Sequence, residues 1–457
     1  MKGIANRRDV VPGIVLMAAL VSFFVWKYPV PVVSATGNDS MVKCRVELDK
    51  TVLPAESPQR AIVKVTLDAA EPIERAGRPA VNLAIVLDRS GSMSGPKIEK
   101  AKDAAIAALR RLAPGDVFSV TIYDHNVETI VPAQNAVNVE WIERRIRQIG
   151  PGGNTALFGG VSQGAAEVRK HLGGEYVHRI ILLSDGLANV GPSNPEDLGR
   201  LGAALVKEEI SVTTIGVGTD YNEDLMARLS QNSDGNTYFV ESSVDLPRIF
   251  SAELGDVLNV VAKKVRIVIE CPEGVRPLTI IGRDGRMKGR TVELSLNQLY
   301  GGQEKYALVE VEIAAGKSGH DMEVASAHVS YDNPFTKKRE SSSGKIRARF
   351  SKSSAEVKKS ANVGVQKEYQ LNLKALAEEK AIDLSDTGKR DEAVEVLKQS
   401  AEKLKEFGNI YKDESILEEA EQMEDKAEQI NKEGMTKKYR KELRTKSYQM
   451  KNQQSSE

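Results

Sequence analysis

The 457-residue sequence has few of the side chains that bind soft metals or carry acid–base chemistry near neutral pH. It contains 2 cysteines and 5 histidines, and neither Cys44 nor Cys271 has a second cysteine or a histidine at metal-ligand spacing. This argues against a zinc site. An excess of charge of one sign is also missing, because 64 basic residues balance 64 acidic ones. A net charge of zero argues against broad electrostatic binding to nucleic acid, which needs a basic face.

Long apolar runs are scarce as well, and the most prominent one lies at the N-terminus. The run Val10–Trp26 follows basic residues and precedes the small residues Val33-Ser34-Ala35, a pattern typical of a secretory signal peptide. It is shorter than the ~20 residues that a spanning helix usually needs. For residues 1–35 we therefore favour a cleaved signal peptide over an uncleaved membrane anchor. Either interpretation predicts an extracytoplasmic protein, whether periplasmic, secreted or at the cell surface.

Residues 78–255 alternate short apolar runs with helical stretches. The runs "VNLAIVLD", "VFSVTIYD", "RIILLSD" and "ISVTTIGVG" are continuous, while stretches such as "KIEKAKDAAIAALRRL" have helical periodicity. Continuous apolar strands are typical of a parallel sheet that is buried on both faces. The alternation therefore predicts a doubly wound, Rossmann-like α/β domain.

The segments on either side of this block have a different pattern. Residues 40–75 and 256–350 contain period-2 alternation, as in "VKCRVELDK" and "KYALVEVEIAAG", which is typical of antiparallel strands. Each segment is too short to make a comfortable sandwich alone. We therefore expect the two to join into one β-sandwich, with the α/β domain inserted between them.

The two cysteines lie in these flanking segments. If the chain is exported, Cys44 and Cys271 could form a disulfide that staples the two halves of the sandwich. The alternative is two free, buried thiols that act as small apolar side chains.

Residues 351–457 are predicted to be helical and highly charged. Two helical stretches meet near Gly388, and Ala393, Leu397 and Ala401 line one face of the second. The pair resembles a tetratricopeptide-type hairpin, but solenoids need several such units and only one is present. We favour a helical hairpin with a mobile tail over a peptide-binding groove. The tail, "TKKYRKELRTK", is basic, and charge runs of this kind are usually solvated helix faces.

Oxygen-bearing side chains follow the predicted strands of the α/β block. They are Asp88, Ser90, Ser92, Thr155 and Asp185. Ligand sites in open α/β sheets form at the carboxyl ends of the strands, so we expect these side chains to gather there. An all-oxygen set favours Mg²⁺, with Mn²⁺ or Ca²⁺ as alternatives. An isolated Asp-x-Ser-x-Ser is more often a turn and helix cap, but its distant companions favour the metal interpretation.

Three motifs in this block resemble those of a known family. "DRSGSM", "GGNTALFGG" and "LLSDG" are similar to the metal-ion-dependent adhesion site of von Willebrand factor type A domains, in family order. The resemblance implies that Asp88, Ser90, Ser92, Thr155 and Asp185 hold a divalent ion with an open coordination position. It further implies that an acidic residue of a partner protein fills that position, as in metal-dependent protein binding or cell adhesion without catalysis.

The layout of the whole chain is distantly similar to bacterial relatives of two families. These are the inter-alpha-trypsin inhibitor heavy chains and the calcium-activated chloride channel regulators. An alternative function stays open, in which the protein is a scaffold or assembly subunit that binds partners through its helical C-terminal region. In that case the metal site is structural or unused.

An enzymatic interpretation fits the sequence poorly. Gly91–Gly95 resembles the G-x-S-x-G elbow of hydrolases, but Met93 occupies its centre and Ser94 lies well past the strand end. A triad would need an aspartate and then a histidine later in the same block, and the histidines are out of that order. The acidic loop "VGTDYNEDL" lacks calcium-loop spacing, so we expect a turn with a helix cap at Asn222.

Overall fold

The computed structural model describes residues 33–34, 40–71, 77–173 and 176–454. Residues 1–32 and 35, and with them most of the predicted signal peptide or anchor, lie outside the described residues. Within the described part, β1 (Val33–Ser34) pairs in parallel with a late strand, β17 (Lys338–Ser351). None of the described helices has the length and apolar character needed to cross a membrane.

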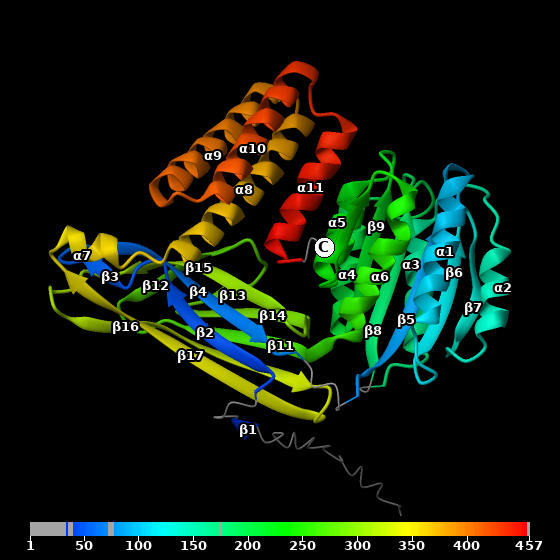
Figure 1. Cartoon of the computed structure of the whole chain (residues 1–457), viewed down its shortest axis with the longest axis horizontal. Helices are drawn as coiled ribbons and strands as arrows, with labels where there is room; N and C mark the ends of the chain where they lie inside the picture. The colour runs from blue at the N-terminus through cyan, green and yellow to red at the C-terminus, as the bar shows by residue number, and fades with distance from the viewer. Residues whose placement is uncertain (1–32, 35–39, 72–76, 174–175, 455–457) are drawn as a thin grey trace, which may run out of the picture. The chain divides into compact units, whose positions relative to one another are not determined.

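The α/β block forms a six-stranded sheet in the order β10-β9-β8-β5-β6-β7 (Figure 1). Its strands are β5 (Ala80–Asp88), β6 (Val117–Tyr123), β7 (Val127–Asn135), β8 (Tyr176–Ser184), β9 (Ile210–Val217) and β10 (Thr237–Val240). Every neighbouring pair is parallel except β6 and β7, which are antiparallel. The prediction of a doubly wound parallel sheet is therefore confirmed, with one antiparallel edge strand.

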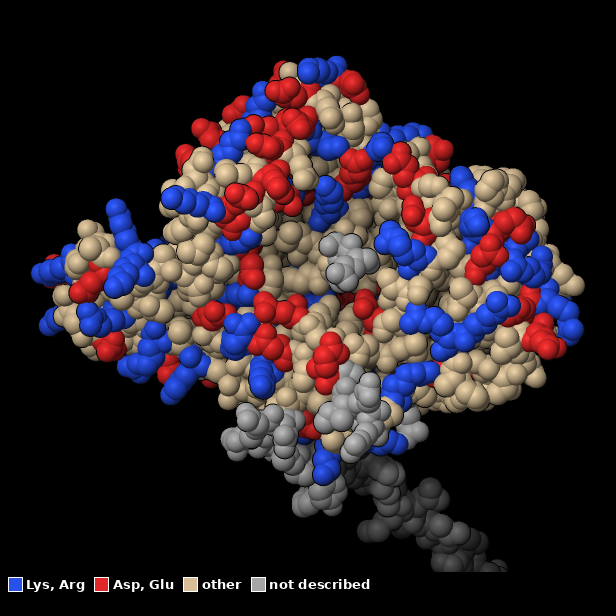
Figure 2. Space-filling view, in the orientation of Figure 1, with Lys and Arg blue, Asp and Glu red and all other residues tan. Residues whose placement is uncertain are grey.

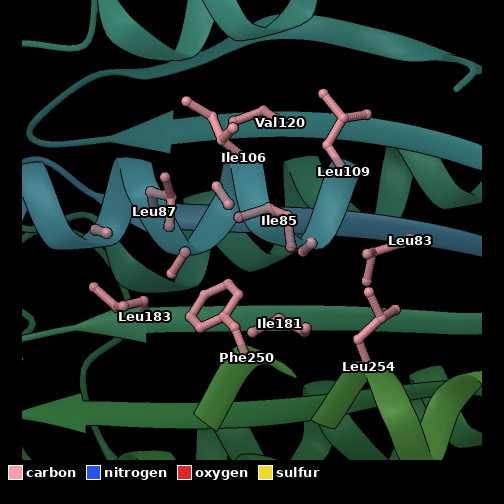
Figure 3. Packing of buried hydrophobic residues seen from close by; sticks show 14 of the residues in the cluster. Leu83, Ile85, Leu87, Ile106, Leu109, Val120, Ile181, Leu183, Phe250 and Leu254 are labelled. Carbon is pink, nitrogen blue, oxygen red and sulfur yellow. The ribbon is translucent and has the colours of Figure 1, made fainter. Parts of the chain in front are cut away.

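Helices cover both faces of this sheet. They are α1 (Pro96–Arg110), α2 (Val139–Arg147), α3 (Leu157–Arg169), α4 (Pro195–Lys207), α5 (Glu223–Asn232) and α6 (Leu246–Leu258). Leu83, Ile85 and Leu87 of β5 pack in one core with α1, α2 and α6, as part of Figure 3 shows. Ala84 and Val86 point into a second core with α3, α4 and α5. Alternate residues of a strand face opposite sides, so burial on both faces requires the continuous apolar run that the sequence contains.

The strands on either side of the α/β block associate with one another. A four-stranded sheet has the order β12-β15-β4-β2, so strands from before the block pair with strands from after it. A second sheet has the order β1-β17-β16-β11-β14-β13, with β3 added to β17. Side chains from both sheets share one hydrophobic core, among them Val63 and Val65 of β4 and Ile267 and Ile269 of β11.

These strands have the following bounds. They are β2 (Val42–Leu48), β3 (Val52–Pro54), β4 (Gln59–Ala69), β11 (Val260–Glu270), β12 (Val275–Ile281), β13 (Arg286–Lys288), β14 (Thr291–Tyr300), β15 (Glu304–Ile313) and β16 (Asp321–Asn333). Most of the pairs are antiparallel, while β1 and β3 lie parallel to β17.

The predicted disulfide is wrong, because both cysteines are free thiols. The backbone N–H of Cys44 in β2 donates to Ser342 Oγ in β17, whereas Cys271 follows the end of β11. Strand β2 and strand β11 belong to different sheets, and the two thiols are not bonded to each other. The alternative of two thiols packed with the apolar core is what the structure has.

The C-terminal region is helical, as predicted. It contains α7 (Ser354–Lys359), α8 (Val363–Asp386), α9 (Arg390–Tyr411), α10 (Glu414–Glu433) and α11 (Lys437–Lys451). The turn between α8 and α9 contains Gly388 at φ +76°, a conformation that favours glycine. Ala393, Leu397 and Ala401 are buried in a core shared with α10, which confirms the predicted face.

The expectation of a mobile basic tail is wrong for the described residues, because α11 is a helix packed against α5 and β10 of the α/β domain (Figure 1). Lys441 Nζ lies 2.7 Å from Glu223 Oε2, and Arg444 Nε lies 2.8 Å from Asp224 Oδ1. Glu223 and Asp224, in the first turn of α5, therefore supply counter-charges of the basic run. On the face shown in Figure 2, basic and acidic side chains are interspersed, in keeping with the zero net charge.

Candidate metal centre

Asp88, the last residue of β5, is fully buried at the carboxyl edge of the sheet. Its Oδ1 accepts a hydrogen bond from the backbone N–H of Ser90 at 2.8 Å, and its Oδ2 accepts one from Ser184 Oγ at 2.7 Å. Burial raises the pKa of Asp88 to about 6, and the charge of Asp185 acts in the same direction. A cation beside this carboxylate would favour its ionised form.

The two alternate serines connect Asp88 to the second carboxylate. Ser90 Oγ and Ser92 Oγ are 3.1 Å apart, and Ser92 Oγ donates to Asp185 Oδ1 at 2.7 Å. Asp185, which directly follows β8, is fully buried like Asp88. The structure thus brings together residues that are almost a hundred positions apart in the sequence, as expected for the ends of neighbouring parallel strands.

Thr155 comes from the glycine-rich loop before α3 and is buried. Its backbone N–H donates to Asn189 Oδ1 at 2.8 Å, and its carbonyl accepts from the backbone N–H of Asn189 and of Val190. The Gly91 N–H donates to the Gly153 carbonyl at 3.1 Å. These bonds tie the three loops to one another, so the side chains they carry are positioned by main-chain contacts.

Gly186 shows how closely the hydroxyl groups converge. A Cβ atom at this position would lie 3.3 Å from Ser92 Oγ, 3.4 Å from Thr155 Oγ1 and 3.7 Å from Ser90 Oγ. Three hydroxyl oxygens therefore surround one small space, and a side chain at residue 186 would occupy it. All five sequence-predicted residues lie at this one site.

The structure adds residues that sequence reasoning did not identify. Ser184 and Asn189 orient Asp88 and Thr155, as described above. Lys97 Nζ lies 2.5 Å from Asp185 Oδ2. A signal for Lys97 was available, because it directly follows Pro96 and so lies in the first turn of the helix after the serine loop.

Asp124 closes the neighbouring loop after β6 and was also missed. Its Oδ1 accepts from the Asn126 N–H at 2.6 Å, its Oδ2 lies 3.1 Å from Arg89 Nε, and its carbonyl accepts from the Ala156 N–H. The side chain is buried and already occupied by these contacts. It therefore fixes the loops that carry Ser90 and Thr155 and lies outside the convergent set.

Ser94 and Asn222, which the sequence raised as a nominal elbow serine and as a helix cap, have contacts outside this set. Ser94 is exposed, and its Oγ donates to the Gly91 carbonyl at 2.7 Å, so its hydrogen-bond partner is a carbonyl and not an imidazole. Asn222 caps α5, with its Oδ1 accepting from the N–H groups of Asp224 and Leu225, which confirms the predicted cap.

The convergent set has a definite chemical character. It offers two carboxylates and three hydroxyls, and it contains no histidine or cysteine. Sites built from three or more His, Cys, Asp or Glu side chains are a different kind, and none is found among the described residues. Oxygen donors without imidazole or thiolate suit a hard divalent cation. With few carboxylates, such a cation would keep positive charge available for a further ligand.

Comparison with known proteins agrees with this geometry. The sequence profile of the von Willebrand factor type A domain matches residues 82–252, which contain the whole site. This chain contains a von Willebrand factor type A domain. We refer to it below as the A domain. Such domains often mediate metal-dependent protein interactions.

Relatives of known sequence cover different parts of the chain. The uncharacterized protein sll0103 of Synechocystis is 26% identical over 58% of this chain and 65% of its own length. Inter-alpha-trypsin inhibitor heavy chain H2 of Mus musculus is 29% identical over 34% of this chain. The chain spans less than two thirds of either relative, and only 17% of the heavy chain.

Solved structures share the fold over a larger part of the chain. The von Willebrand factor type A protein from Catenulispora acidiphila superposes with a TM-score of 0.66 over 83% of this chain and 90% of its own, at 18% identity. The ArnB paralog VWA2 from Sulfolobus acidocaldarius gives 0.58 over 90% and 98%, at 16% identity. At these identities the likeness concerns the fold alone.

Proposed function

We propose that the A domain binds a divalent cation, with Mg²⁺ as the first candidate, through Asp88, Ser90, Ser92, Thr155 and Asp185. The cation in turn binds an acidic side chain of a partner protein, and the protein is not an enzyme. The observation that carries this proposal is the convergence of three hydroxyls around Gly186 beside two buried carboxylates. A hard cation in this set would have only two formal negative charges around it, so it would attract a further carboxylate.

Cation binding is tested directly by isothermal titration calorimetry with Mg²⁺, Mn²⁺ and Ca²⁺. The wild type is expected to bind one cation per chain, and Asp88→Ala is expected to bind none. Asp103→Ala is the matched control, because Asp103 is a partly exposed acid on α1 that pairs with Arg147 and lies outside the set. Equal binding by the wild type and Asp88→Ala would contradict the proposal.

Partner binding is tested by immobilising the wild type, Asp88→Ala and Asp103→Ala and passing solubilised envelope proteins over each. A partner is expected to be retained by the wild type and Asp103→Ala in Mg²⁺, and released by EDTA. Amidation of the partner's carboxylates with a carbodiimide should prevent capture. Capture that survives EDTA and Asp88→Ala would instead favour a scaffold that binds through its helical C-terminal region.

We also infer that the two sheets around the A domain count as one β-sandwich domain that carries the A domain as an insertion. The shared core and the pairing of β4 with β15 support this inference.

Location outside the cytoplasm, with residues 1–35 as a signal peptide or anchor, is also part of what we propose. Immunoblotting of cell fractions for the full chain and for a variant without residues 1–35 tests it.

A further inference from the structure

Lys97 places a positive charge directly beside the proposed cation ligands. It is the second residue of α1, and its Nζ lies 2.5 Å from Asp185 Oδ2. The other oxygen of the same carboxylate, Oδ1, accepts from Ser92 Oγ. Asp185 is fully buried, whereas the Lys97 side chain is about a third exposed.

Other elements also surround this ammonium. Gly218, just after β9, approaches it so closely that a Cβ atom there would lie 3.8 Å from Lys97 Nζ. In the loop that follows, Asp220 pairs with Lys437 at the start of α11 at 2.9 Å. The pKa of Asp220 is lowered by Lys437 first and by Lys97 as well. Lys437 takes up part of the charge of Asp220 and leaves Asp185 as the carboxylate in direct contact with Lys97.

We propose that Lys97 tunes the cation site: its ammonium offsets the charge of Asp185, weakens the hold on the cation, and increases the attraction for an acidic partner. This inference rests on the proposed function. Two carboxylates and a divalent cation together carry no net charge, so an incoming carboxylate would be attracted by the cation itself and not by the site as a whole. With the ammonium of Lys97 the same site is positive by one unit, and the attraction grows accordingly.

A purely structural role for Lys97 predicts different behaviour. If the ammonium served only as counter-charge to a buried acid, its removal would lower stability and leave cation affinity unchanged or weaker. Tuning predicts the opposite sign for the cation, because removing a like charge near the site favours cation binding. Cation affinity therefore separates the two roles, whereas both predict a loss of stability in the absence of the cation.

The first experiment measures Mn²⁺ binding to the full chain by calorimetry and by electron paramagnetic resonance. Lys97→Met is expected to bind Mn²⁺ roughly tenfold more tightly than the wild type, the effect of one unit charge removed several ångströms away. Lys97→Arg keeps the charge and should stay within about twofold. Lys100→Met, one turn along α1 at an exposed position, is the matched control and should bind like the wild type.

The second experiment measures two further effects of the same variants. In EDTA, Lys97→Met should melt at a lower temperature than the wild type, because Asp185 is then buried without a counter-charge. In the Mn²⁺-loaded proteins, acetate serves as the carboxylate probe, and its methyl proton relaxation reports binding at the Mn²⁺ ion. Acetate should bind Lys97→Met several-fold more weakly than the wild type and the Lys100→Met control.

The possible outcomes separate this inference from the proposed function. Tighter Mn²⁺ binding and weaker acetate binding by Lys97→Met support it. Equal or weaker Mn²⁺ binding by Lys97→Met, with Lys97→Arg like the wild type, overturns the inference and leaves the cation site intact. Absence of Mn²⁺ binding by the wild type overturns the proposed function and the inference together.

Discussion

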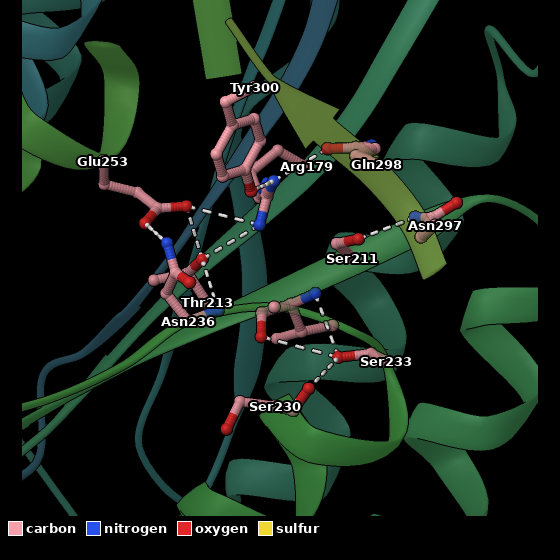
Figure 4. Close-up of polar contacts among 12 residues, drawn as sticks. Arg179, Ser211, Thr213, Ser230, Ser233, Asn236, Glu253, Asn297, Gln298 and Tyr300 are labelled. Carbon is pink, nitrogen blue, oxygen red and sulfur yellow. Dashed lines mark hydrogen bonds and ion pairs between the residues drawn. The ribbon is translucent and has the colours of Figure 1, made fainter. Parts of the chain in front are cut away.

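The two edges of the A-domain sheet each contain buried charged groups, but they are arranged in opposite ways. At the amino edge, the fully buried Arg179 of β8 donates to Gln298 Oε1 at 2.8 Å and to Tyr300 Oη at 2.7 Å, and its guanidinium lies 3.3 Å from Glu253 Oε1 (Figure 4). Glu253 also accepts from Thr213 Oγ1 and Asn236 Nδ2. Both terminal nitrogens of Arg179 and both oxygens of Glu253 thus have partners within the protein.

At the carboxyl edge, two buried carboxylates are combined with hydroxyls that converge around Gly186. One of these carboxylates, Asp185, pairs with Lys97, which is partly exposed. The amino edge is therefore an ion-pair network that joins the A domain to β14, whereas the carboxyl edge is suited to take up a cation. Burial of charge alone does not mark a binding site, because the two edges differ in the kind of partner: a buried guanidinium neutralises Glu253 at the amino edge, while hydroxyls and one partly exposed ammonium contact the carboxylates at the carboxyl edge.

The largest effect is expected from breaking the ion-pair network at the amino edge. Arg179→Met leaves Glu253 buried without its cation and should lower the free energy of unfolding by about 4 kcal/mol. Urea denaturation measures this loss, which should be the same with Mg²⁺ and with EDTA. Arg169→Met is the control, since Arg169 pairs with Glu208 at a partly exposed position and its loss should cost less than about 1 kcal/mol. Equal losses in the two variants would contradict the comparison.

A smaller effect is expected from His178, next to Arg179 at the amino edge. Burial lowers the pKa of His178 from 6.5 to about 4, and the charge of Lys263 adds to this. Between these values the unfolded chain binds a proton that the native protein does not, so stability falls as the pH drops from 6.5 to 4. The loss should approach about 3 kcal/mol. Urea denaturation at a series of pH values measures this fall. The free energy of unfolding should fall less steeply between pH 6.5 and 4 in His178→Gln than in the wild type. The control His320→Gln, at an exposed position, should follow the wild type.

The smallest effect on stability is expected at the carboxyl edge. In Gly186→Ala the new methyl group would lie 3.3 Å from Ser92 Oγ and fill the space between the hydroxyls. Cation affinity should fall at least about tenfold, equivalent to about 1.4 kcal/mol, while the free energy of unfolding in EDTA should change by less than about 1 kcal/mol. Calorimetry with Mg²⁺ measures the affinity. Gly115→Ala is the control, because a Cβ there meets nothing within 4 Å. Unchanged affinity in Gly186→Ala would place the cation elsewhere.

Much of the A domain could be predicted because its evidence is local. A strand buried on both faces needs a continuous apolar run, and each run was visible in the sequence. Asp88 and Asp185 directly follow two such runs, so their meeting at one edge follows from the parallel sheet. Ser184 and Asn189 were missed, since their effect depends on which atoms they reach across the loops.

The predictions of a disulfide and of a mobile tail were wrong because both depend on how segments far apart in the sequence pack together. Alternation showed that Cys44 and Cys271 lie in or beside strands but contained no information on which sheet each strand joins, and β2 and β11 belong to different sheets. The basic run of α11 has the pattern of a solvated helix face. Its docking depends on Glu223 and Asp224, more than two hundred positions earlier in the chain.

The sequence by itself determined the elements of the A domain and the chemical type of its site, because apolar periodicity and the residues after each strand are local properties of the chain. Only the tertiary structure decided which charges meet. It brought Lys97 to Asp185, Arg179 to Glu253 and α11 to α5. The physical reason is that charges act through distance and burial, which depend on packing between segments far apart in the sequence.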